Sequence, residues 1–279
     1  HINSSGEVTS FKNDCNAVVN ALHLDNGTLY IGGNFTAVGD LKEYGAVLNT
    51  TDGASDPLVA EPNYRVFASI PDGNGGWYIG GDFTKVGDSV RNNLAQINAA
   101  GEVTAWNPDA NNHVYSLAIS GNTVYAGGGF TTVGGQTRQR IVAIDATTGI
   151  PTTWNPIANN FVHTIAVDGS TIYIGGDFFT VNGQSRDGIA AIEATTGIPT
   201  AWNPDVQGSV RTIAVSGNTI YAGGGISYVG GQARNKIAAI NATTGISFKL
   251  IIGVPDTDFA SGTASNTSAA AATRHPAST

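Results

Sequence analysis

The feature that most constrains this chain is a motif written five times along it. A tyrosine followed closely by a glycine pair recurs at Tyr30, Tyr78, Tyr125, Tyr173 and Tyr221, a step of 47 or 48 residues. A fixed period of this length is typical of an array of one supersecondary unit, because a single unit is too small to bury its own apolar face. The sequence therefore predicts one repeat domain, over residues 13 to 251.

Within the third repeat, residues 114 to 155, short apolar segments alternate with turn signals. The period-2 pattern predicts strands over 114 to 119, 123 to 130, 140 to 145 and 152 to 155. Four short antiparallel strands in a unit of about 47 residues are typical of a propeller blade. No apolar spacing of about 3.6 residues persists for two turns. We therefore expect an all-β fold, a β-propeller of four-stranded antiparallel blades with five complete repeats.

The five repeats align column by column. The first strand carries a valine, the third strand ends in an aliphatic residue, and the fourth strand carries a tryptophan that is weakened to leucine in the first and last repeats. These columns are Val19, Val66, Val114, Val162 and Val210; Leu48, Ile97, Ile144, Ile192 and Ile240; and Leu58, Trp106, Trp154, Trp202 and Leu250. Glycine weakens a strand interior. The recurrence of the pair, as in Gly80-Gly81, therefore indicates a close approach between neighbouring blades.

These residues resemble a known family. The motifs Y-[IA]-G-G-x-F-x-x-V-G, G-Q-x-R and W-N-P look like the delta-sixty type of propeller repeat, which occurs in bacterial secreted and surface proteins. They are also similar to kelch repeats and to fungal cell-polarity surface propellers. The resemblance covers about 235 residues and implies a propeller. It also implies a binding or scaffolding module, although one fold hosts many functions.

The array starts in the middle of a blade. Residues 2 to 12, INSSGEVTSFK, repeat residues 97 to 107, INAAGEVTAWN, which cover the last two strands of a blade. We therefore assign 1–12 to a partial N-terminal blade and favour six blades in all. Residues 252–279 are rich in Ala, Ser and Thr, which is typical of a linker, or they provide irregular closing strands. The incomplete blade is also a candidate surface for self-assembly with another chain.

Composition limits the partners and chemistry. The net charge is −8 and the 13 Lys and Arg are scattered, which disfavours nucleic acid. Cys15 is the only cysteine, so neither an intrachain disulfide nor a cysteine-cluster metal site is expected. No apolar run approaches the ~18 residues of a membrane span, and we expect no membrane insertion. The Asn/Thr/Gly-rich composition favours a secreted or cell-surface protein. We expect no cofactor and no bound metal.

Two loops of each blade are expected on one face: the loop between the second and third strands (the b–c loop) and the loop leading to the next blade (the d–a loop). A basic residue recurs in the b–c loop, and carboxylates and amides recur in the d–a loop. The candidate binding residues are Lys42, Arg91, Arg138, Arg186, Arg234, Asp109, Asn111, Asn159 and Asp205. They predict a ring that grips acidic or polyhydroxyl ligands. The alternative, favoured because the residues recur in every blade, is that the arginines bind loop carbonyls or carboxylates between blades.

Trp106, Trp154 and Trp202 also allow two interpretations. Aromatic faces stack on sugars, which suggests a lectin with one weak site per blade, but the regular position in the fourth strand favours packing between sheets. The histidines occupy different repeat columns, and neither an H-E-x-x-H nor a G-x-S-x-G motif occurs. We therefore expect no enzyme.

The sequence favours a non-catalytic, secreted or cell-surface β-propeller that acts in adhesion, matrix assembly or scaffolding. Its partner would be a protein or glycan on a cell surface or matrix. The alternatives are a multivalent carbohydrate-binding lectin and, third, a propeller enzyme that acts on glycans.

Overall fold

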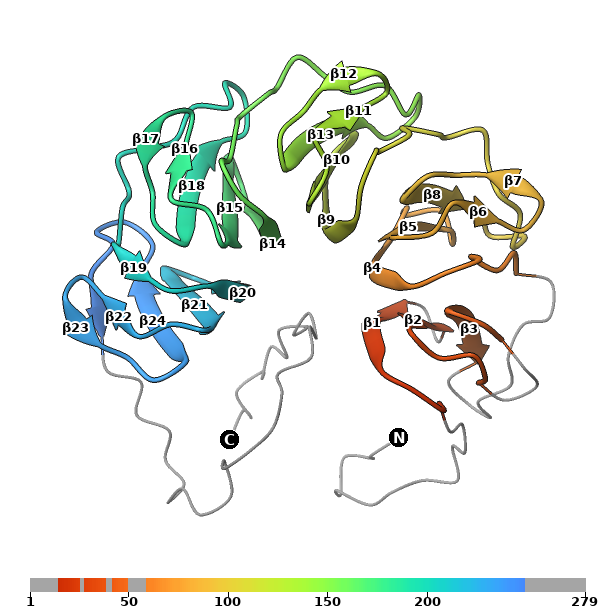
Figure 1. The fold of residues 1–279 in the computed structure, drawn as a ribbon, viewed down its shortest axis with the longest axis horizontal. Coiled ribbons are helices and arrows are strands. Elements are labelled where there is room, and N and C mark those ends of the chain that lie inside the picture. Colours follow the sequence, from red (N-terminus) through yellow and green to blue (C-terminus); the bar gives the residue numbers. More distant parts are fainter. Residues whose placement is uncertain (1–14, 26–27, 39–41, 50–58, 249–279) are drawn as a thin grey trace, which may run out of the picture.

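The computed structural model describes residues 15–25, 28–38, 42–49 and 59–248, and these contain strands and no helix. The strands form blades arranged round a central axis, as the repeat predicts (Figure 1). Five blades are described. The predictions for residues 1–12 and 252–279, and for Leu58 and Leu250, lie outside the described residues.

Each blade is built on an antiparallel sheet whose first strand is innermost, followed outward by the second and third strands (Figure 1). Blade 1 contains β1 (Val19–Asp25), β2 (Thr28–Gly33) and β3 (Gly45–Asn49). Blade 2 contains β4 (Val66–Pro71), β5 (Trp77–Gly81), β6 (Lys85–Val86), β7 (Ser89–Val90) and β8 (Leu94–Ile97). Blade 3 contains β9 (Val114–Ser120), β10 (Thr123–Gly128), β11 (Thr132–Val133), β12 (Gln136–Thr137) and β13 (Ile141–Asp145).

The last two blades follow the same order. Blade 4 contains β14 (Val162–Asp168), β15 (Thr171–Gly176), β16 (Thr180–Val181), β17 (Gln184–Ser185) and β18 (Ile189–Glu193). Blade 5 contains β19 (Val206–Gln207), β20 (Val210–Ser216), β21 (Thr219–Gly224), β22 (Tyr228–Val229), β23 (Gln232–Ala233), β24 (Ile237–Asn241) and β25 (Ser247–Phe248).

The predicted strands of the third repeat need two corrections. The second strand, β10, ends at Gly128 rather than at Phe130, and the loop that follows carries its own small hairpin, β11–β12. The fourth strand predicted over 152 to 155 is reduced to one bridge, Ile144 to Pro151, and blade 4 has the same bridge to Pro199. Around this bridge Thr152 N donates to the Ala143 carbonyl and Asp145 N donates to the Ile150 carbonyl, and the described residues show no further pairing beyond it. In blade 5 Ser247 takes this position and β25 forms.

The apolar core lies between blades rather than within them. Each of four clusters joins the tyrosine and outer-strand residues of one blade to the inner-strand valine of the next, and Tyr125 and Trp154 of blade 3 thus pack with Val162 and Ile165 of blade 4. A Cβ on Gly127 would lie 2.6 Å from Val162 Cγ1 of the next blade. The predicted close approach at the glycine pair is therefore present, because this side chain would occupy the space of the neighbouring valine.

Every inner strand carries a one-residue irregularity next to its valine. The pairing of inner and second strands shifts register at this point in all five blades, as between Val162 and Thr164. A bulge of this kind re-aims one side chain and is common next to binding sites. The bulged positions lie along the inner edge of the ring, where successive inner strands contact one another.

Among the described residues, no helix is long and apolar enough to cross a membrane.

Candidate functional site

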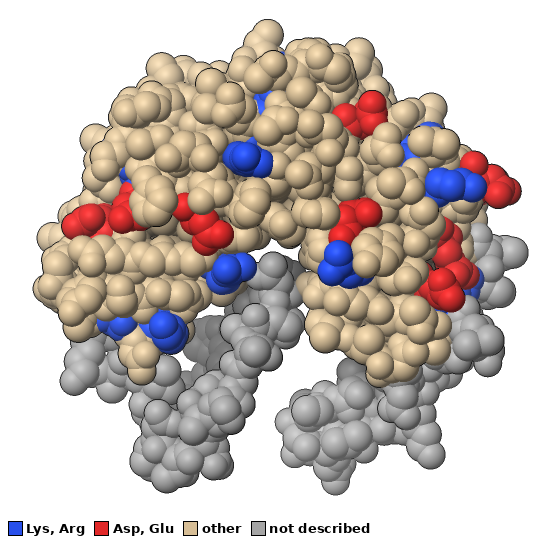
Figure 2. All heavy atoms as spheres, in the orientation of Figure 1, with Lys and Arg blue, Asp and Glu red and all other residues tan. Residues whose placement is uncertain are grey.

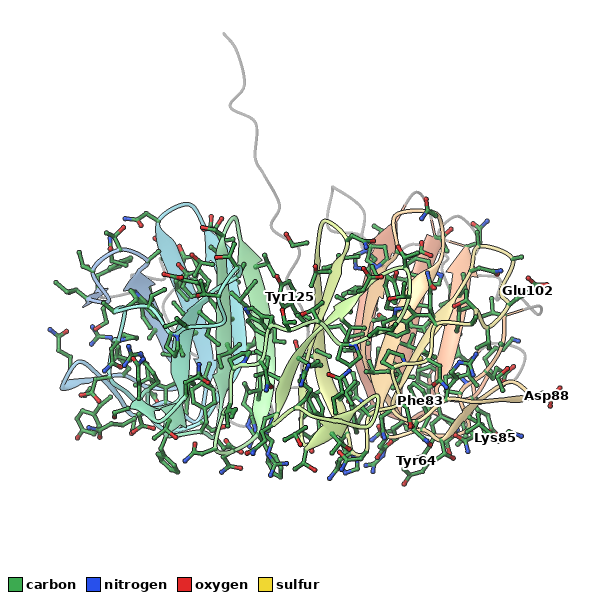
Figure 3. All side chains as sticks on the ribbon, turned by 90° about the horizontal axis from the view of Figure 1, so that it is seen from above. Tyr64, Phe83, Lys85, Asp88, Glu102 and Tyr125 are labelled. Atoms are coloured by element: carbon green, nitrogen blue, oxygen red, sulfur yellow. The ribbon has the colours of Figure 1, made fainter. Side chains whose placement is uncertain are left out.

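The b–c and d–a loops emerge on the same face, as predicted. In Figure 3, Tyr64 of a d–a loop and Lys85 of a b–c loop lie at one edge of the ring, and Glu102 lies toward the other. The two loops are joined by strand pairing, for example between Ala110 and Val133. We call this side the loop face.

The recurring arginines of the loop face are bound within their own blades. The Arg138 guanidinium donates to the carbonyls of Thr137 (2.8 Å) and Thr152 (2.7 Å) and to Gln136 Oε1 (2.8 Å). Arg186 repeats this set, and Arg234 donates to a carbonyl, to Gln232 Oε1 and to a serine hydroxyl. Arg91 donates to two backbone carbonyls. Arg138 and Arg186 are also buried. This geometry is that of the structural alternative, in which the arginine ties the b–c hairpin to the outer edge of its sheet.

The other predicted binding residues have internal partners as well. Asn111 and Asn159 accept hydrogen bonds from two consecutive backbone N–H groups of the b–c loop, and so hold the two loops of one blade together. Asp109 accepts from Asn92 of the preceding blade (2.8 Å). Lys42 lies 2.8 Å from the Glu61 carboxylate across the first blade interface. A ligand role for this ring, including Asp205, stays a prediction.

The tryptophans are packing residues between blades. Trp106 of blade 2 contacts Tyr78 edge to face at 4.8 Å, and its Nε1 donates to the Asp145 carbonyl of blade 3. Trp154 and Trp202 repeat both contacts, with the tyrosine of their own blade and with a carbonyl of the blade that follows. All three are buried, so their faces do not lie open to a sugar.

The blades differ from one another at the inner end of the loop face. Three columns meet there: the residues before and after the inner-strand valine and the residue after the glycine pair. A backbone hydrogen bond joins the first and third columns in each blade, as from Asp82 N to Arg65 O. We call this set the inner rim. It consists of Val18, Arg65, His113, Phe161 and Ser209; Asn20, Phe67, Tyr115, His163 and Arg211; and Asn34, Asp82, Gly129, Asp177 and Gly225.

Aromatic rings run across the inner rim from blade 2 to blade 4. The Tyr115 ring lies 5.5 Å from Phe67, 5.3 Å from His163 and 6.2 Å from Phe161, between ring centroids. The Arg65 guanidinium lies over the Phe67 ring at 5.5 Å. These distances are those of edge-to-face and cation–π contacts. The rings form one continuous partly exposed surface, because Phe67 and Tyr115 are half-buried and Phe161 is exposed.

Charged pairs flank the rings. The Arg65 guanidinium lies 2.5 Å from Asp82 Oδ2, and His113 Nδ1 lies 3.7 Å from the same oxygen. The Asp82 side chain is only 5% exposed, and its Oδ1 has no hydrogen-bond partner among the described residues. His163 Nε2 lies 2.8 Å from Asp177 Oδ2. Figure 2 shows basic and acidic side chains on both sides of the central gap on this face.

Burial sets the protonation of the histidine pair. Desolvation lowers the pKa of His163 below its ordinary value, although Asp177 opposes this shift. Burial alone would raise the pKa of Asp177, but hydrogen bonds, among them that from His163, hold it lower than usual. Near neutral pH the pair is thus a neutral imidazole that donates to a carboxylate, since a carboxylate only accepts.

A cavity of about 350 Å³ lies beside the rim, between blades 4 and 5. It is lined by Asp177, Phe179, Asp187, Gln207, Gly208 and Ser209. Burial and the nearby Asp205 raise the pKa of Asp187. Two carboxylates, an amide, a hydroxyl and an aromatic ring are groups that can bind a polar ligand and stack on it.

Comparison with known proteins decides the family. Residues 17–248 match the family described as outer membrane protein assembly factor BamB. The chain belongs to the BamB family. This is a family of propeller repeats, as the sequence predicts, while the finer resemblance to delta-sixty and kelch repeats finds no support in this match.

Solved structures agree with the BamB-family fold. The WD40 β-propeller domain of Doa1 aligns with a TM-score of 0.60 at 11% identity, over 86% of this chain and 70% of that one. The computationally designed Ika8 protein aligns with a TM-score of 0.55 at 15% identity, over 84% of this chain and 61% of that one. The chain thus spans less than two thirds of the Ika8 length. These likenesses show the fold alone. No curated protein matches the chain.

Sequence reasoning missed most of the inner rim of this BamB-family chain. The predicted binding residues come from columns that repeat along the chain, whereas the inner rim is made of columns that vary. The available signal was the contrast between a constant valine and its changing neighbours, such as His113 and Tyr115 around Val114. Among the described residues, no group of three or more His, Cys, Asp or Glu is arranged to hold a metal ion.

Proposed function

We propose that this chain is a non-catalytic, protein-binding propeller that acts outside the cytoplasm, at the cell envelope or surface, in adhesion or scaffolding. The propeller fold with BamB-type repeats supports a protein-interaction module. The family's name refers to outer membrane protein assembly, which supports an envelope location. The delta-sixty resemblance implies secreted and surface proteins, and so it also supports a location outside the cytoplasm.

One observation carries the proposal: the blades are alike where they contact each other and differ at the inner rim. Residues that build the ring need the same chemistry in every blade, and the loop-face arginines meet this need with internal carbonyls. Phe67 and Tyr115 stand where blades 1 and 5 have Asn20 and Arg211, Phe161 stands where blade 5 has Ser209, and the three rings lie partly open. Aromatic anchors beside arginine are the residue types that carry most binding energy at protein interfaces.

The rim suits a polypeptide that carries both apolar and charged side chains. The ring surface from Phe67 to Phe161 offers apolar contact area, and the Arg65 side chain, which is 35% exposed, offers a cationic donor beside it. An acceptor on a bound segment would pair with this guanidinium and would fix the register of the segment on the rings.

The test is affinity capture from an envelope extract of the source organism, with the purified chain as bait. We expect at least one protein to be retained by the wild type, and to be lost with the double variant Tyr115→Ala, Phe161→Ala, since truncating a central aromatic anchor costs about 2 kcal/mol or more. The matched control is Ile150→Ala, an exposed aliphatic residue in the turn between the third and fourth strands. If the double variant retained the partner as strongly as the wild type does, the inner rim would be rejected as the binding surface.

A lectin is the second candidate, and the cavity between blades 4 and 5 favours it. Its carboxylates, amide, hydroxyl and exposed Phe179 are suited to a polyhydroxyl ligand. The buried tryptophans give no support to one site per blade. On a glycan array, a lectin would give a signal that Gln207→Ala removes and Trp154→Phe keeps. An array without any glycan signal would reject the lectin and leave the protein-binding proposal. It would also speak against an enzyme that acts on glycans, since such an enzyme must bind its glycan.

A further inference from the structure

Two neighbouring blade boundaries each hold an arginine that is stacked on an aromatic ring at the loop face. At the boundary of blades 2 and 3, the Arg65 guanidinium lies over the Phe67 ring and 2.5 Å from the Asp82 carboxylate. At the boundary of blades 3 and 4, the Arg140 guanidinium lies over the Phe161 ring, 5.2 Å from its centroid. The fold thus has a place for a guanidinium between the loops of adjacent blades, where a ring face attracts the cation.

At the boundary of blades 4 and 5, small residues replace these large ones. Gly188 takes the position of Arg140 and keeps its left-handed backbone, with φ of 68° against 70°, but it carries no side chain. Ser209 takes the position of Arg65. Before it lies Gly208, whose φ of 115° favours glycine. The cavity of about 350 Å³ lies between these two loops, within the range of about 300–1,000 Å³ that is typical of ligand pockets.

The cavity is acidic, and one of its two carboxylates has no partner in the described part of the chain. Asp177 binds His163, but the Asp187 carboxylate makes no hydrogen bond or ion pair there, and burial and Asp205 raise its pKa. In blade 2 the position of Asp187 is Asn92, which donates to Asp109, the equivalent of Asp205. Blades 4 and 5 therefore place two carboxylates where blades 2 and 3 pair an amide with a carboxylate.

The nearby cation of the chain acts on Asp177 rather than on Asp187. Burial would raise the pKa of Asp177, but hydrogen bonds and then the charge of Arg211 keep it low. No cation lowers the pKa of Asp187 in this way, and Arg211 does not line the cavity. Figure 2 shows acidic side chains over the boundary of blades 4 and 5. The cavity thus offers a carboxylate that a cation from outside can pair with.

We propose that this cavity binds the guanidinium of an arginine side chain that belongs to the protein segment bound on the inner rim. The inference rests on the proposed function and names one side chain of the partner. Asp177 and Ser209 belong both to the inner rim and to the wall of the cavity, so a segment that lies on the rings of the rim passes the mouth of the cavity.

The groups that line the cavity suit arginine better than lysine. Phe179 is 60% exposed and replaces the Thr131 of blade 3, and it offers the ring face that Phe161 offers to Arg140. A planar guanidinium stacks on such a ring and donates two parallel hydrogen bonds to a carboxylate such as that of Asp187. A lysine ammonium is a compact point charge and cannot do both.

The direct test is an NMR titration of the isotope-labelled, full 279-residue chain with N-acetyl-arginine amide. We expect saturable shifts of the Gly188 and Gly208 amides and of the Gln207 side chain. N-acetyl-citrulline amide has nearly the same shape without the charge and should cause no saturable shift, because the charge-assisted hydrogen bonds are lost. N-acetyl-lysine amide should bind about threefold more weakly, because it loses the stacking contact.

The other blades supply variants that keep the fold. Asp187→Asn introduces the residue type of blade 2 and should weaken arginine binding about tenfold, because the charged acceptor is lost. Phe179→Thr introduces the residue type of blade 3 and should weaken binding about threefold. The matched control is Asp88→Asn, which removes an exposed carboxylate at the outer edge of blade 2 and should bind like the wild type (Figure 3).

Five results would overturn the proposal. These are no saturable shift with the arginine compound, equal binding of the citrulline compound, equal binding of the lysine compound, unchanged binding in Asp187→Asn, or a glycan-array signal that Gln207→Ala removes. The last result would assign the cavity to a sugar.

Capture from the envelope extract then links the cavity to the partner. A protein retained through the inner rim should be retained more weakly by Asp187→Asn than by Asp88→Asn, and equal retention would overturn the assignment of the arginine to that partner. If the wild type captured no protein at all, the proposed function would fail. The titration with the arginine compound needs no partner, so the two failures can be told apart.

Discussion

At the scale of single residues, the first glycine of each pair is where neighbouring blades come closest. Gly32, Gly80, Gly127 and Gly175 would each place a Cβ less than 3 Å from the valine of the next blade. Gly223 has the same sequence context, but a Cβ added there would lie nearest to Cγ2 of Thr212, a residue of the same blade, at 2.9 Å. The glycine pair is thus the same in all five repeats, but only the first four repeats need the glycine to make room for a neighbouring valine.

Alanine substitution should expose this difference. Gly127→Ala should lower the free energy of unfolding by about 1–3 kcal/mol, because the new methyl group overpacks the blade interface. Gly223→Ala should cost much less, because Thr212 can turn aside and alanine restricts the unfolded chain. Chemical denaturation measures both. Equal losses would mean that a further blade already packs on Gly223 in the free protein.

The buried histidine of the rim makes stability depend on pH. The pKa of His163 in the folded chain lies below its ordinary value of 6.5. At a pH between the folded-state pKa and 6.5, the unfolded chain therefore binds more protons than the folded chain does. The free energy of unfolding should therefore fall as pH falls through this window, and remain steady above it. The cause is the cost of charging an imidazole that is 8% exposed.

The repeat itself supplies the variant that tests this. In blade 1 the equivalent pair is Asn20 and Asn34, joined by a hydrogen bond of 2.8 Å. His163→Asn should keep a donor for Asp177 and remove the pH dependence, as measured by urea denaturation at several pH values between 5 and 8. The control is His23→Asn, on the same kind of strand. A pH dependence unchanged in His163→Asn would refute the assignment.

At the scale of elements, the b–c hairpin is held to its blade by one arginine. Arg138 binds the end of β12 and the Thr152 carbonyl beyond β13. Arg138→Ala leaves these carbonyls without their donor and should cost about 1–3 kcal/mol of unfolding free energy. Lys85→Ala, in the exposed β6 of blade 2, should stay within about 0.5 kcal/mol. If the Arg138→Ala variant kept its stability but lost ligand binding, this result would instead favour the interpretation in which the loop-face arginines bind a ligand.

At the scale of the whole molecule, the features that recur in every repeat could be predicted from the sequence. The strand columns, the glycine pair and the tryptophan positions follow from packing rules that every blade shares, so five aligned copies average out the local ambiguity. The b–c hairpin was missed because a two-residue pairing leaves no alternating pattern, and the predicted fourth strand of the third repeat was wrong because this segment makes only one bridge to the third strand.

The candidate site was harder to predict for a related reason. A binding surface built from one residue of each blade has no motif along the chain, and His113, Tyr115 and Phe161 come together only when the ring forms. Repetition identified the loop-face arginines, and the structure gives them hydrogen-bond partners within their own blades. Departures from the repeat next to a constant residue are the better guide to the binding surface of such a propeller.

The central claim is that partners bind at the inner rim, and a photo-crosslink tests it most directly. The photoreactive residue p-benzoylphenylalanine replaces Tyr115 in one variant and Ile150 in another, and both are irradiated in the envelope extract. We predict a discrete polypeptide adduct from position 115 and none from position 150. No adduct at 115, or the same adduct from both positions, would contradict the account.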